Sequence, residues 1–160
     1  MRKIFFIGVL LLLSASIVGC DMINKILPTP KATVGEKSEG ERIEKDGAVC
    51  TVISSDKTSL QVRIENNTDS TWQSGNMRDY SLEMKKGNEW YTVTQIGELA
   101  NTMELMIFSP NETLTHTFLF TDRYGQLAPG EYRIVKSFWA NKTATEDAHE
   151  FYLICEFTVE

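Results

Sequence analysis

The sequence holds few of the residues on which enzymes and metalloproteins most often depend. Among 160 residues there are two histidines and three cysteines, and no serine or cysteine nucleophile stands in a recognised catalytic motif. The carboxylates are numerous but scattered, so no pair suited to glycoside hydrolysis can be singled out, and no metal-ligand spacing is present. We therefore expect no catalytic residues, no metal site and no cofactor.

A surplus of positive charge is also absent. The chain carries 16 basic and 22 acidic side chains, a formal net charge of −6. Loss of Arg2 and Lys3 with an N-terminal signal would leave 14 basic and 22 acidic side chains, a net charge of −8. Such a surface repels nucleic-acid phosphates, so we expect no nucleic-acid partner. A chain of this length has room for one ordinary domain beside a signal and a tether.

No apolar run is long enough to span a membrane comfortably. The apolar stretch from Ile4 to Leu13 follows Arg2 and Lys3 and precedes small residues, which is the order of a secretory signal peptide. The residues that follow, Ile17-Val18-Gly19-Cys20, resemble the bacterial lipobox. This resemblance implies cleavage after residue 19 and a diacylglyceryl group on the Cys20 thiol. An uncleaved signal anchor with an incidental cysteine is the alternative.

Two acyl chains hold a protein firmly to a bilayer, because each buried CH₂ contributes about 0.8 kcal/mol. We therefore expect a membrane protein of the extracytoplasmic face, anchored by lipid on Cys20. The segment from Asp21 to about Gly47 contains Pro28, Pro30, three glycines and many charges, with little apolar periodicity. We predict a signal peptide at residues 1–19, a lipidated flexible tether at 20–47 and a domain at 48–160. As a coil, the tether would span roughly 30 Å.

Beyond Ala48 the apolar residues alternate with a period of two between turn residues, which indicates an all-β sandwich. We predict about seven antiparallel strands, with one turn of helix between Thr94 and Leu105 as the alternative to an all-strand domain. Lys86-Gly87-Asn88 is expected to form the turn of a hairpin. The predicted strands are Val49–Ile53, Leu60–Ile64, Tyr80–Met84, Trp90–Val93, Leu114–Phe120, Tyr132–Phe138 and Phe151–Val159.

Four segments of this domain resemble the bacterial Ig-like domains of extracytoplasmic proteins from Bacillus- and Clostridium-like organisms. They are IENNT (64–68), YSLEMKK (80–86), WYTV (90–93) and, most distinctive, YGQLAPGEYRIVK (124–136). The resemblance extends from about Leu60 to Val159. It implies an immunoglobulin-like β-sandwich without known catalysis, and it carries no ligand-binding residues across.

Tyr132 and two cysteines are candidates for structural roles in such a sandwich. The Tyr132 hydroxyl is expected to hydrogen-bond back to the preceding corner, as in a tyrosine corner; a strand tyrosine without this bond is the alternative. Cys50 and Cys155 lie on the apolar sides of the first and last predicted strands, which are neighbours in many sandwiches, so an exported chain permits a disulfide between them. Its closure would stabilise by roughly 4.7 kcal/mol in the chain-entropy model. Two buried free thiols are the alternative.

The tryptophans and histidines are candidates for surface roles. Trp90 and Trp139 are expected in the core. Trp72 follows a loop-like run of polar residues, and an exposed ring there predicts a contact surface. His116 is expected at the edge of the core as a hydrogen-bonded side chain, and His149 in solvent at the start of the last strand.

These observations favour a lipid-anchored, non-catalytic Ig-like module that binds a protein or a cell-envelope component through loops at one end of the sandwich. One alternative is an envelope hydrolase with a carboxylate cleft, which a concave pocket holding two or more acidic residues would favour. Another is a structural accessory subunit, which a long unpaired edge strand or a large apolar patch would favour. The fold by itself cannot choose among them.

Overall fold

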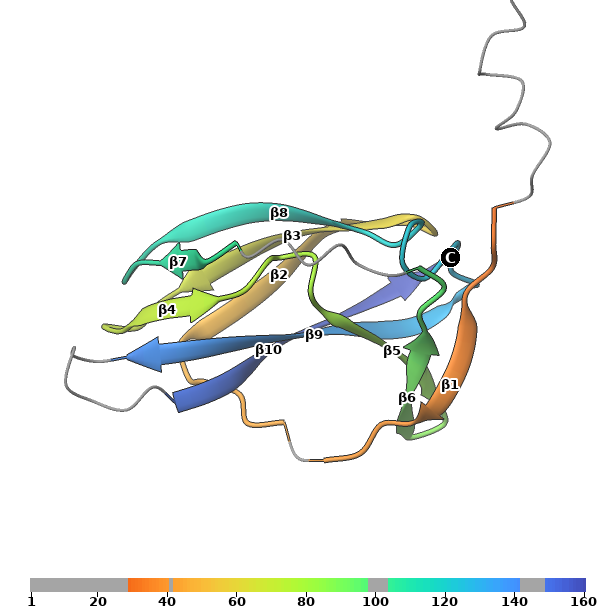
Figure 1. Cartoon of the computed structure of the whole chain (residues 1–160), viewed down its shortest axis with the longest axis horizontal. Coiled ribbons are helices and arrows are strands. Elements are labelled where there is room, and N and C mark those ends of the chain that lie inside the picture. The colour runs from red at the N-terminus through yellow and green to blue at the C-terminus, as the bar shows by residue number, and fades with distance from the viewer. Residues whose placement is uncertain (1–28, 41, 98–103, 142–148) are drawn as a thin grey trace, which may run out of the picture.

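The computed structural model describes residues 29–40, 42–97, 104–141 and 149–160, and these form ten strands in two sheets (Figure 1). The signal peptide, Cys20 and the first part of the tether lie outside the described residues. Within the described part of the chain, no helix has the length and apolar character needed to cross a membrane. The strands are β1 (Thr33–Lys37), β2 (Ala48–Ser55), β3 (Ser59–Asn66), β4 (Thr71–Ser74), β5 (Ser81–Lys86), β6 (Glu89–Thr94), β7 (Met106–Phe108), β8 (Thr113–Leu119), β9 (Gly130–Asn141) and β10 (His149–Val159).

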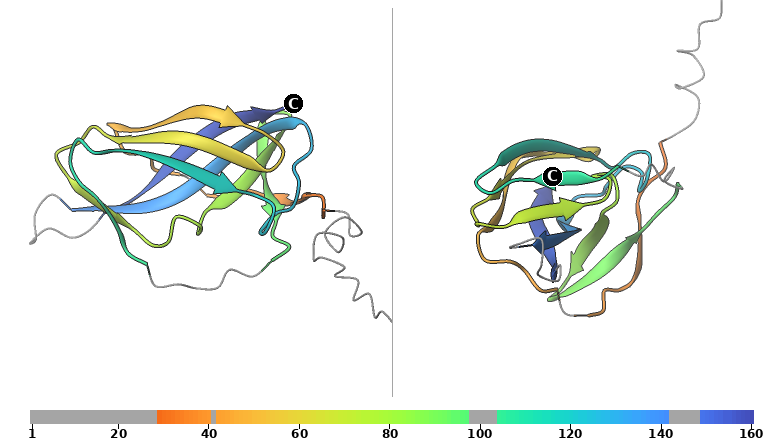
Figure 2. Two further views of the ribbon diagram at one scale, coloured as in Figure 1. Left: turned by 90° about the horizontal axis from the view of Figure 1, so that it is seen from above. Right: turned by 60° about the vertical axis from the view of Figure 1, so that its left-hand side comes forward.

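The two sheets are packed face to face as a sandwich (Figure 2). The smaller sheet has the order β2-β3-β8, and the larger has the order β1-β6-β5-β9-β4-β7 with β10 added on β9. Every paired strand is antiparallel to its neighbour. The predicted all-β sandwich is confirmed, and all seven predicted strands are present. β1, β4 and β7 were not predicted, because strands of three to five residues contain too few alternations to stand out.

The long strand β9 organises the larger sheet. One edge of β9 pairs with β10 along its whole length, and the other edge pairs with β5 and then with β4. Gln73 pairs with Trp139 and Ser81 with Val135, so β4 and β5 lie end to end along β9. Between these two pairs, the chain that joins β4 to β5 has four residues more than the matching length of β9. Residues 75–80 therefore loop away from the sheet, while Ser74 Oγ donates a hydrogen bond of 2.8 Å to the Ser137 carbonyl.

Alternate residues of the strands fill the space between the sheets. On β3 these are Leu60, Val62 and Ile64, which the alternation had placed inward. Burying each such side chain contributes about 1.5–3 kcal/mol. The other large members of the core are Trp72, Tyr80, Leu82, Phe108, Phe118, Phe120, Tyr124, Tyr132, Ile134, Phe138, Phe151, Leu153 and Phe157.

The prediction of an exposed Trp72 is wrong. Trp72 is 0% exposed, because it lies in β4 at an inward position between Phe108 of β7 and Ala140 of β9. Its ring centroid lies 5.0 Å from that of Phe151, and Nε1 donates to Thr68 Oγ1 at 3.2 Å. The polar run before Trp72 is a tight connection between β3 and β4, and the strand resumes just before the tryptophan. Trp72 therefore stabilises the core and offers no contact surface.

The predicted tether is partly wrong as well, since part of it belongs to the domain. Strand β1 pairs with β6, and the residues that follow, 38–40 and 42–47, cross the outer face of the larger sheet to reach β2 (Figure 1). We call these residues the crossing segment. Ser38 N donates to the Trp90 carbonyl at 2.8 Å, and Tyr152 N donates to the Ile43 carbonyl at 2.8 Å. Folded structure therefore begins well before Ala48.

A buried carboxylate holds the crossing segment in place. Glu83 is 0% exposed and receives hydrogen bonds from Arg133 Nε at 2.6 Å, Arg42 Nη2 at 3.1 Å and the Ser38 hydroxyl. Burial raises the pKa of Glu83, but the bonds from Ser38, Arg133 and Arg42 outweigh burial and hold the pKa below its ordinary value. The ion pair thus joins the crossing segment to β5 and β9.

The β5–β6 hairpin is confirmed in the predicted place. Lys86 pairs with Glu89, so Gly87 and Asn88 form a two-residue turn. Gly87 has φ +62°, and glycine at the first central position with positive φ is the signature of a type II′ turn.

Glu83→Gln should lower the free energy of unfolding at neutral pH by about 2 kcal/mol, because it leaves Arg42 and Arg133 without their anion. Because the pKa of Glu83 is lowered in the folded state, the stabilisation is complete above the ordinary carboxyl pKa of 4.5 and is lost as the pH falls through the lowered value. Urea unfolding at several pH values should therefore show the variant and the parent converging in acid. Glu131→Gln, which removes an exposed partner of Lys85, is the control and should change little; an equal loss in both variants would contradict the prediction.

Candidate functional site

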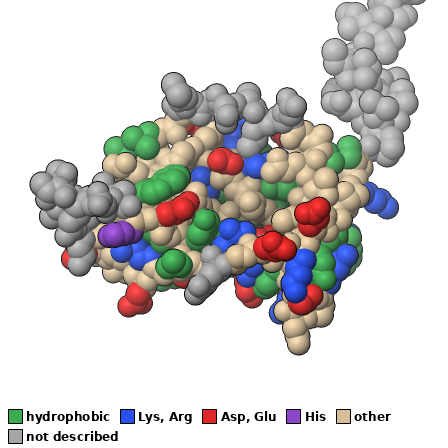
Figure 3. Space-filling model, turned by 60° about the horizontal axis from the view of Figure 1, so that its bottom comes forward, with side chains coloured by type: hydrophobic (Ala, Val, Ile, Leu, Met, Phe, Trp, Pro, Cys, Tyr) green, Lys and Arg blue, Asp and Glu red, His purple; other side chains and the backbone are tan. Residues whose placement is uncertain are grey.

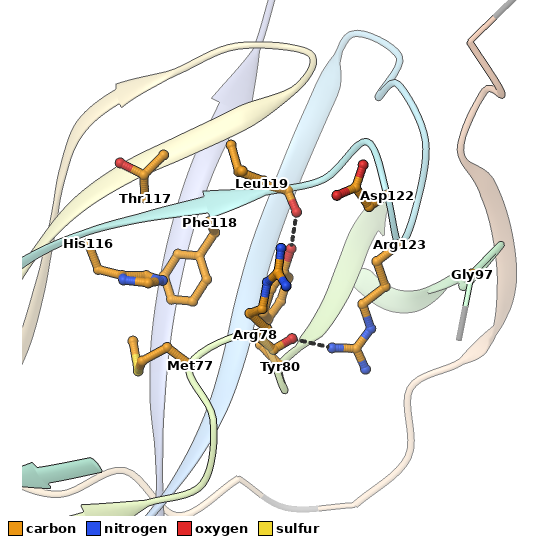
Figure 4. Close-up of a pocket in the computed structure, with 10 residues that line it drawn as sticks. All are labelled: Met77, Arg78, Tyr80, Gly97, His116, Thr117, Phe118, Leu119, Asp122 and Arg123. Carbon is orange, nitrogen blue, oxygen red and sulfur yellow. Dashed lines mark hydrogen bonds between the residues drawn. The ribbon is translucent and has the colours of Figure 1, made fainter. Parts of the chain in front are cut away.

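One pocket lies between β8 and the loop that interrupts β4 and β5 (Figure 4). It has a volume of about 360 Å³. His116 and Phe118 of β8 lie on one side, Met77 and Tyr80 on the other, and Arg123 comes from the turn after β8. The remaining lining residues are Arg78, Gly97, Thr117, Leu119 and Asp122.

Arg123 is held firmly at the wall of this pocket. It is 8% exposed, and its Nη1 donates to the Arg78 carbonyl at 2.6 Å. Its guanidinium carbon lies 5.4 Å from the ring centroids of both Tyr80 and Tyr124, so two aromatic faces stabilise the charge. Asp79 Oδ1 is the nearest anion, at 3.6 Å from Nη2.

The other polar groups of the pocket are constrained by burial. The Tyr80 hydroxyl donates to the Leu119 carbonyl at 2.9 Å, and burial raises its pKa. His116 is half-buried at the edge of the core, as expected, with its ring 4.6 Å from that of Phe118. The hydrogen bond expected of its side chain is not found among the described residues. Burial lowers the pKa of His116, so the neutral imidazole is favoured. His149 lies exposed at the first position of β10, also as expected.

The pocket does not have the chemistry of a carboxylate cleft. Asp122 is the one acidic residue among those that line it, beside Arg78, Arg123 and His116. No group of three or more histidine, cysteine, aspartate or glutamate side chains in the described ranges is arranged to hold a metal ion. The observation that would have favoured a hydrolase, two acidic residues converging in one pocket, is therefore not met at this site.

A second candidate surface lies on the outer face of the larger sheet, near β4 and β7. Gln73 pairs with Ile107 on one side and with Trp139 on the other, so these side chains point to the same face. Trp139 is 40% exposed, Ile107 56% and Leu105 66%. We call Leu105, Ile107 and Trp139 the apolar row.

The expected burial of Trp90 and Trp139 is corrected by the structure. Trp139 lies on the outer side of β9, because Phe138 and Ala140 take the inward positions. Trp90 is half-buried under cations: Arg133 lies 4.4 Å and Lys85 5.6 Å from its ring centroid. The same alternation that places Trp72 inside therefore places Trp139 outside.

Tyr132 makes the hydrogen bond that was expected of it. Its hydroxyl donates to the Ala128 carbonyl, four residues upstream, at 2.8 Å. Burial raises the pKa of Tyr132, so the hydroxyl remains a donor at neutral pH. The bond ties the corner before β9 to the strand, which is the geometry of a tyrosine corner.

Cys50 and Cys155 meet where β2 borders β10. They come from facing sheets, and at the end of β2 Ser55 Oγ donates to the Thr158 carbonyl of β10 at 2.7 Å. Both are free thiols in this structure. A hydrogen bond to Cys155, together with burial, raises the pKa of the Cys50 thiol. The two sulfur atoms are thus neighbours, and the disulfide between them stays a prediction.

The comparison with known families agrees with this architecture. The family model for the bacterial Ig-like domain matches residues 49–152. The chain belongs to the bacterial Ig-like domain family. The match begins in β2 and ends within β10, so β1 and the crossing segment of this Ig-like chain lie outside it. Among curated proteins, no match to the chain is found.

Sequence reasoning missed the pocket and the apolar row of this Ig-like protein. Both depend on how β4, β5 and β7 line up along β9, which no local pattern reports. The Phe138-Trp139-Ala140 alternation was a usable signal for the row, because a run of strand residues cannot turn both Phe138 and Trp139 inward.

In protein recovered from outside the cytoplasm, we expect Cys50 and Cys155 to form a disulfide. Both thiols lose a proton, and two electrons pass to the disulfide of an extracytoplasmic thiol–disulfide oxidoreductase, which becomes a dithiol. Alkylation of the unfolded chain followed by mass spectrometry should label both cysteines only after reduction. Cys50→Ala with Cys155→Ala should then lower the melting temperature relative to the oxidised parent. Full labelling of the unreduced chain would contradict the prediction.

Proposed function

We propose that this Ig-like protein is anchored by lipid on Cys20 at the extracytoplasmic face of the membrane and binds an envelope protein there without catalysing a reaction. An Ig-like domain fits a non-catalytic extracytoplasmic module. The observation that carries the proposal of a protein partner is the apolar row, a cross-strand group of large exposed side chains on a chain of net negative charge.

The apolar row has the composition of a protein contact. Tryptophan is enriched among the residues that contribute most to protein binding, and isoleucine and leucine next to it enlarge the area that loses water. Acidic side chains border the row: Glu104 precedes Leu105, and Glu150 pairs with Trp139. Figure 3 shows hydrophobic, acidic and basic side chains intermixed on the outer face of the sheet. A partner with an apolar centre and a basic rim would match it.

The edge strand supports the same conclusion. β7 pairs with β4 and, within the described part of the chain, with no other strand, so its second edge can take hydrogen bonds from a partner. Ile107 lies on this strand, so an added strand would run beside the apolar row. This arrangement favours a protein over a sugar or a lipid as the occupant of this face.

Cys20→Ala should abolish membrane anchoring, because diacylation of the thiol is the expected source of membrane affinity. Fractionation of cells should find the parent chain in membranes, released only by detergent, and labelling with a fatty-acid analogue should mark the parent and not the variant. Equal labelling of the two, or membrane retention of the variant by an uncleaved signal, would contradict lipidation of Cys20.

Trp139→Ala and Ile107→Asp should weaken capture of the partner by at least about tenfold, because each removes a central part of the apolar row. A photo-crosslinking residue at position 105, in intact membranes, should give one defined protein adduct, and a basic surface is expected on the partner. Both variants should retain the parental melting temperature within a few degrees, because the altered side chains face solvent.

The matched control is Ile53→Asp, which alters an exposed isoleucine at the irregularity of β2 in the smaller sheet. It should leave the adduct unchanged. An adduct that survives Trp139→Ala, or that Ile53→Asp weakens equally, would exclude the apolar row as the binding surface. A crosslink between two copies of this chain would show that the partner is a second copy and not another envelope protein.

A further inference from the structure

The pocket lined by Arg123 lies at the end of the sandwich from which the chain leads back to Cys20. The turn that carries Arg123 contacts the first described residues: Gln126 N donates to the Pro30 carbonyl at 2.8 Å, and Ala32 N to the Gln126 carbonyl at 2.9 Å. Gly125 has φ +81°, and a Cβ added there would lie 2.3 Å from the Pro30 carbonyl oxygen. The start of β1 and the C-terminus lie at this same end (Figure 1).

A lipid on Cys20 would place this end of the domain near the bilayer. Pro30 is the tenth residue after Cys20. Covalent geometry limits such a segment to about 36 Å even when it is fully extended. The apolar row lies near the other end of β9 and so would face away from the membrane (Figure 1). The pocket is therefore the candidate site closest to the lipid headgroups.

Positive charge is concentrated around this pocket in a chain that is acidic as a whole. The guanidinium of Arg123 is buried, and its Nε has no hydrogen-bond partner among the described residues. Arg78 is exposed at the opening. Lys136 lies on β9 and is 2% exposed. Burial lowers the pKa of Lys136; the positive charge of Arg123 lowers it further, and the negative charge of Asp79 opposes this. Three cationic side chains thus gather near two carboxylates, those of Asp79 and Asp122.

The buried cations need a further anion to offset their desolvation. A buried guanidinium is costly unless its donors and its charge are matched. Asp79 lies 3.6 Å from Arg123 and has a largely exposed side chain, so it offsets the charge only in part. Arg123 Nε and the exposed Arg78 guanidinium could both donate to an oxyanion that enters the pocket.

Apolar side chains line the rest of the opening. Met77 and Phe118 are buried in the pocket wall, and Leu119 is exposed at the rim. Ile96, also exposed, is tied to the same place because its N–H donates to the Arg123 carbonyl at 2.7 Å. An oxyanion that carries an apolar body would contact both kinds of side chain.

We propose that this pocket binds a phosphate oxyanion through Arg78 and Arg123, and that the membrane is its source, as the phosphate of a lipid headgroup. The assignment of the membrane rests on the proposed lipid anchor; the phosphate site itself does not. The exposed Leu119 and Ile96 would contact the apolar part of the lipid, and the domain would stand with this end on the bilayer.

The test uses the chain from residue 20 onward with Cys20→Ala, so that no lipid is attached. Inorganic phosphate is titrated while NMR resonances of the His116 and Tyr80 rings are followed. Sedimentation with vesicles of phosphatidylcholine containing a quarter phosphatidylglycerol, and with phosphatidylcholine alone, tests the membrane as the source. A chain of net charge −8 is repelled by anionic vesicles in general, so binding to them requires a local cationic site.

Arg78→Gln is the informative variant, because Arg123 binds the backbone carbonyl of residue 78 and not its side chain. It should weaken phosphate binding by about tenfold, the loss of one charge-assisted hydrogen bond. Arg63→Gln removes the same charge from the outer face of the smaller sheet, where Arg63 pairs with Glu65, and should leave binding unchanged. Thermal unfolding of both variants verifies that each is folded.

Phosphate binding that depends on Arg78 and not on Arg63 supports the site. If the chain also sediments with the anionic vesicles, and Arg78→Gln abolishes this sedimentation, the source of the phosphate is the lipid headgroup. If the chain binds inorganic phosphate but does not sediment with the vesicles, the source is free phosphate, and the membrane part of the proposal is overturned. No shift of the His116 and Tyr80 resonances, or equal weakening by both variants, overturns the site. Because the chain carries no lipid, these outcomes do not depend on whether Cys20 is acylated.

Discussion

The pairing of β9 with two successive strands along one edge is the constraint on which the rest of the structure depends. β4 and β5 both run antiparallel to β9, and together they act as one strand interrupted by a loop. The loop has to leave the sheet because its four surplus residues find no partners on β9. It carries Met77, Arg78 and Asp79 to the mouth of the sandwich, opposite β8. The pocket is thus a direct product of strand register, and its residues need not be near one another in the sequence.

A second constraint acts on the outer face of the same sheet. Glu83 occupies a strand position that normally faces solvent, yet the crossing segment covers it and supplies Arg42 and Ser38 as partners. Arg42, one of the charged residues that made this segment look like a tether, is the residue whose ion pair with Glu83 binds the segment to the sheet. Composition alone cannot distinguish a flexible tether from a segment bound to the domain, because a charged residue in solvent and one in an ion pair are the same residue type. The consequence is a short connection between the domain and Cys20.

The sequence predicted the strands that have six or more residues. Leu60, Val62 and Ile64 on β3, the turn at Gly87, and the bond from Tyr132 to Ala128 were all expected where they occur. Trp72 and Trp139 were assigned in reverse, because polar residues before Trp72 suggested a loop, and β4 has only four residues. The pocket could not be predicted, since Arg123, His116 and Met77 are brought together by sheet packing and by no motif. Family membership does not supply these residues either, because a sandwich fixes the scaffold and leaves its loops free.

The two candidate surfaces, the apolar row and the pocket lined by Arg123, lie near opposite ends of β9. Near Trp139 the exposed side chains are apolar with an acidic border, which suits contact with a basic protein surface. Near Arg123 the cations outnumber the carboxylates close to them, and this end adjoins the segment that leads to Cys20. A lipid on Cys20 would hold this end of the domain near the bilayer, and the opposite end would then face outward. The polarity of charge along the sandwich therefore matches the polarity that an N-terminal anchor would impose, with the cationic end towards phosphate headgroups and the apolar row towards other proteins of the envelope.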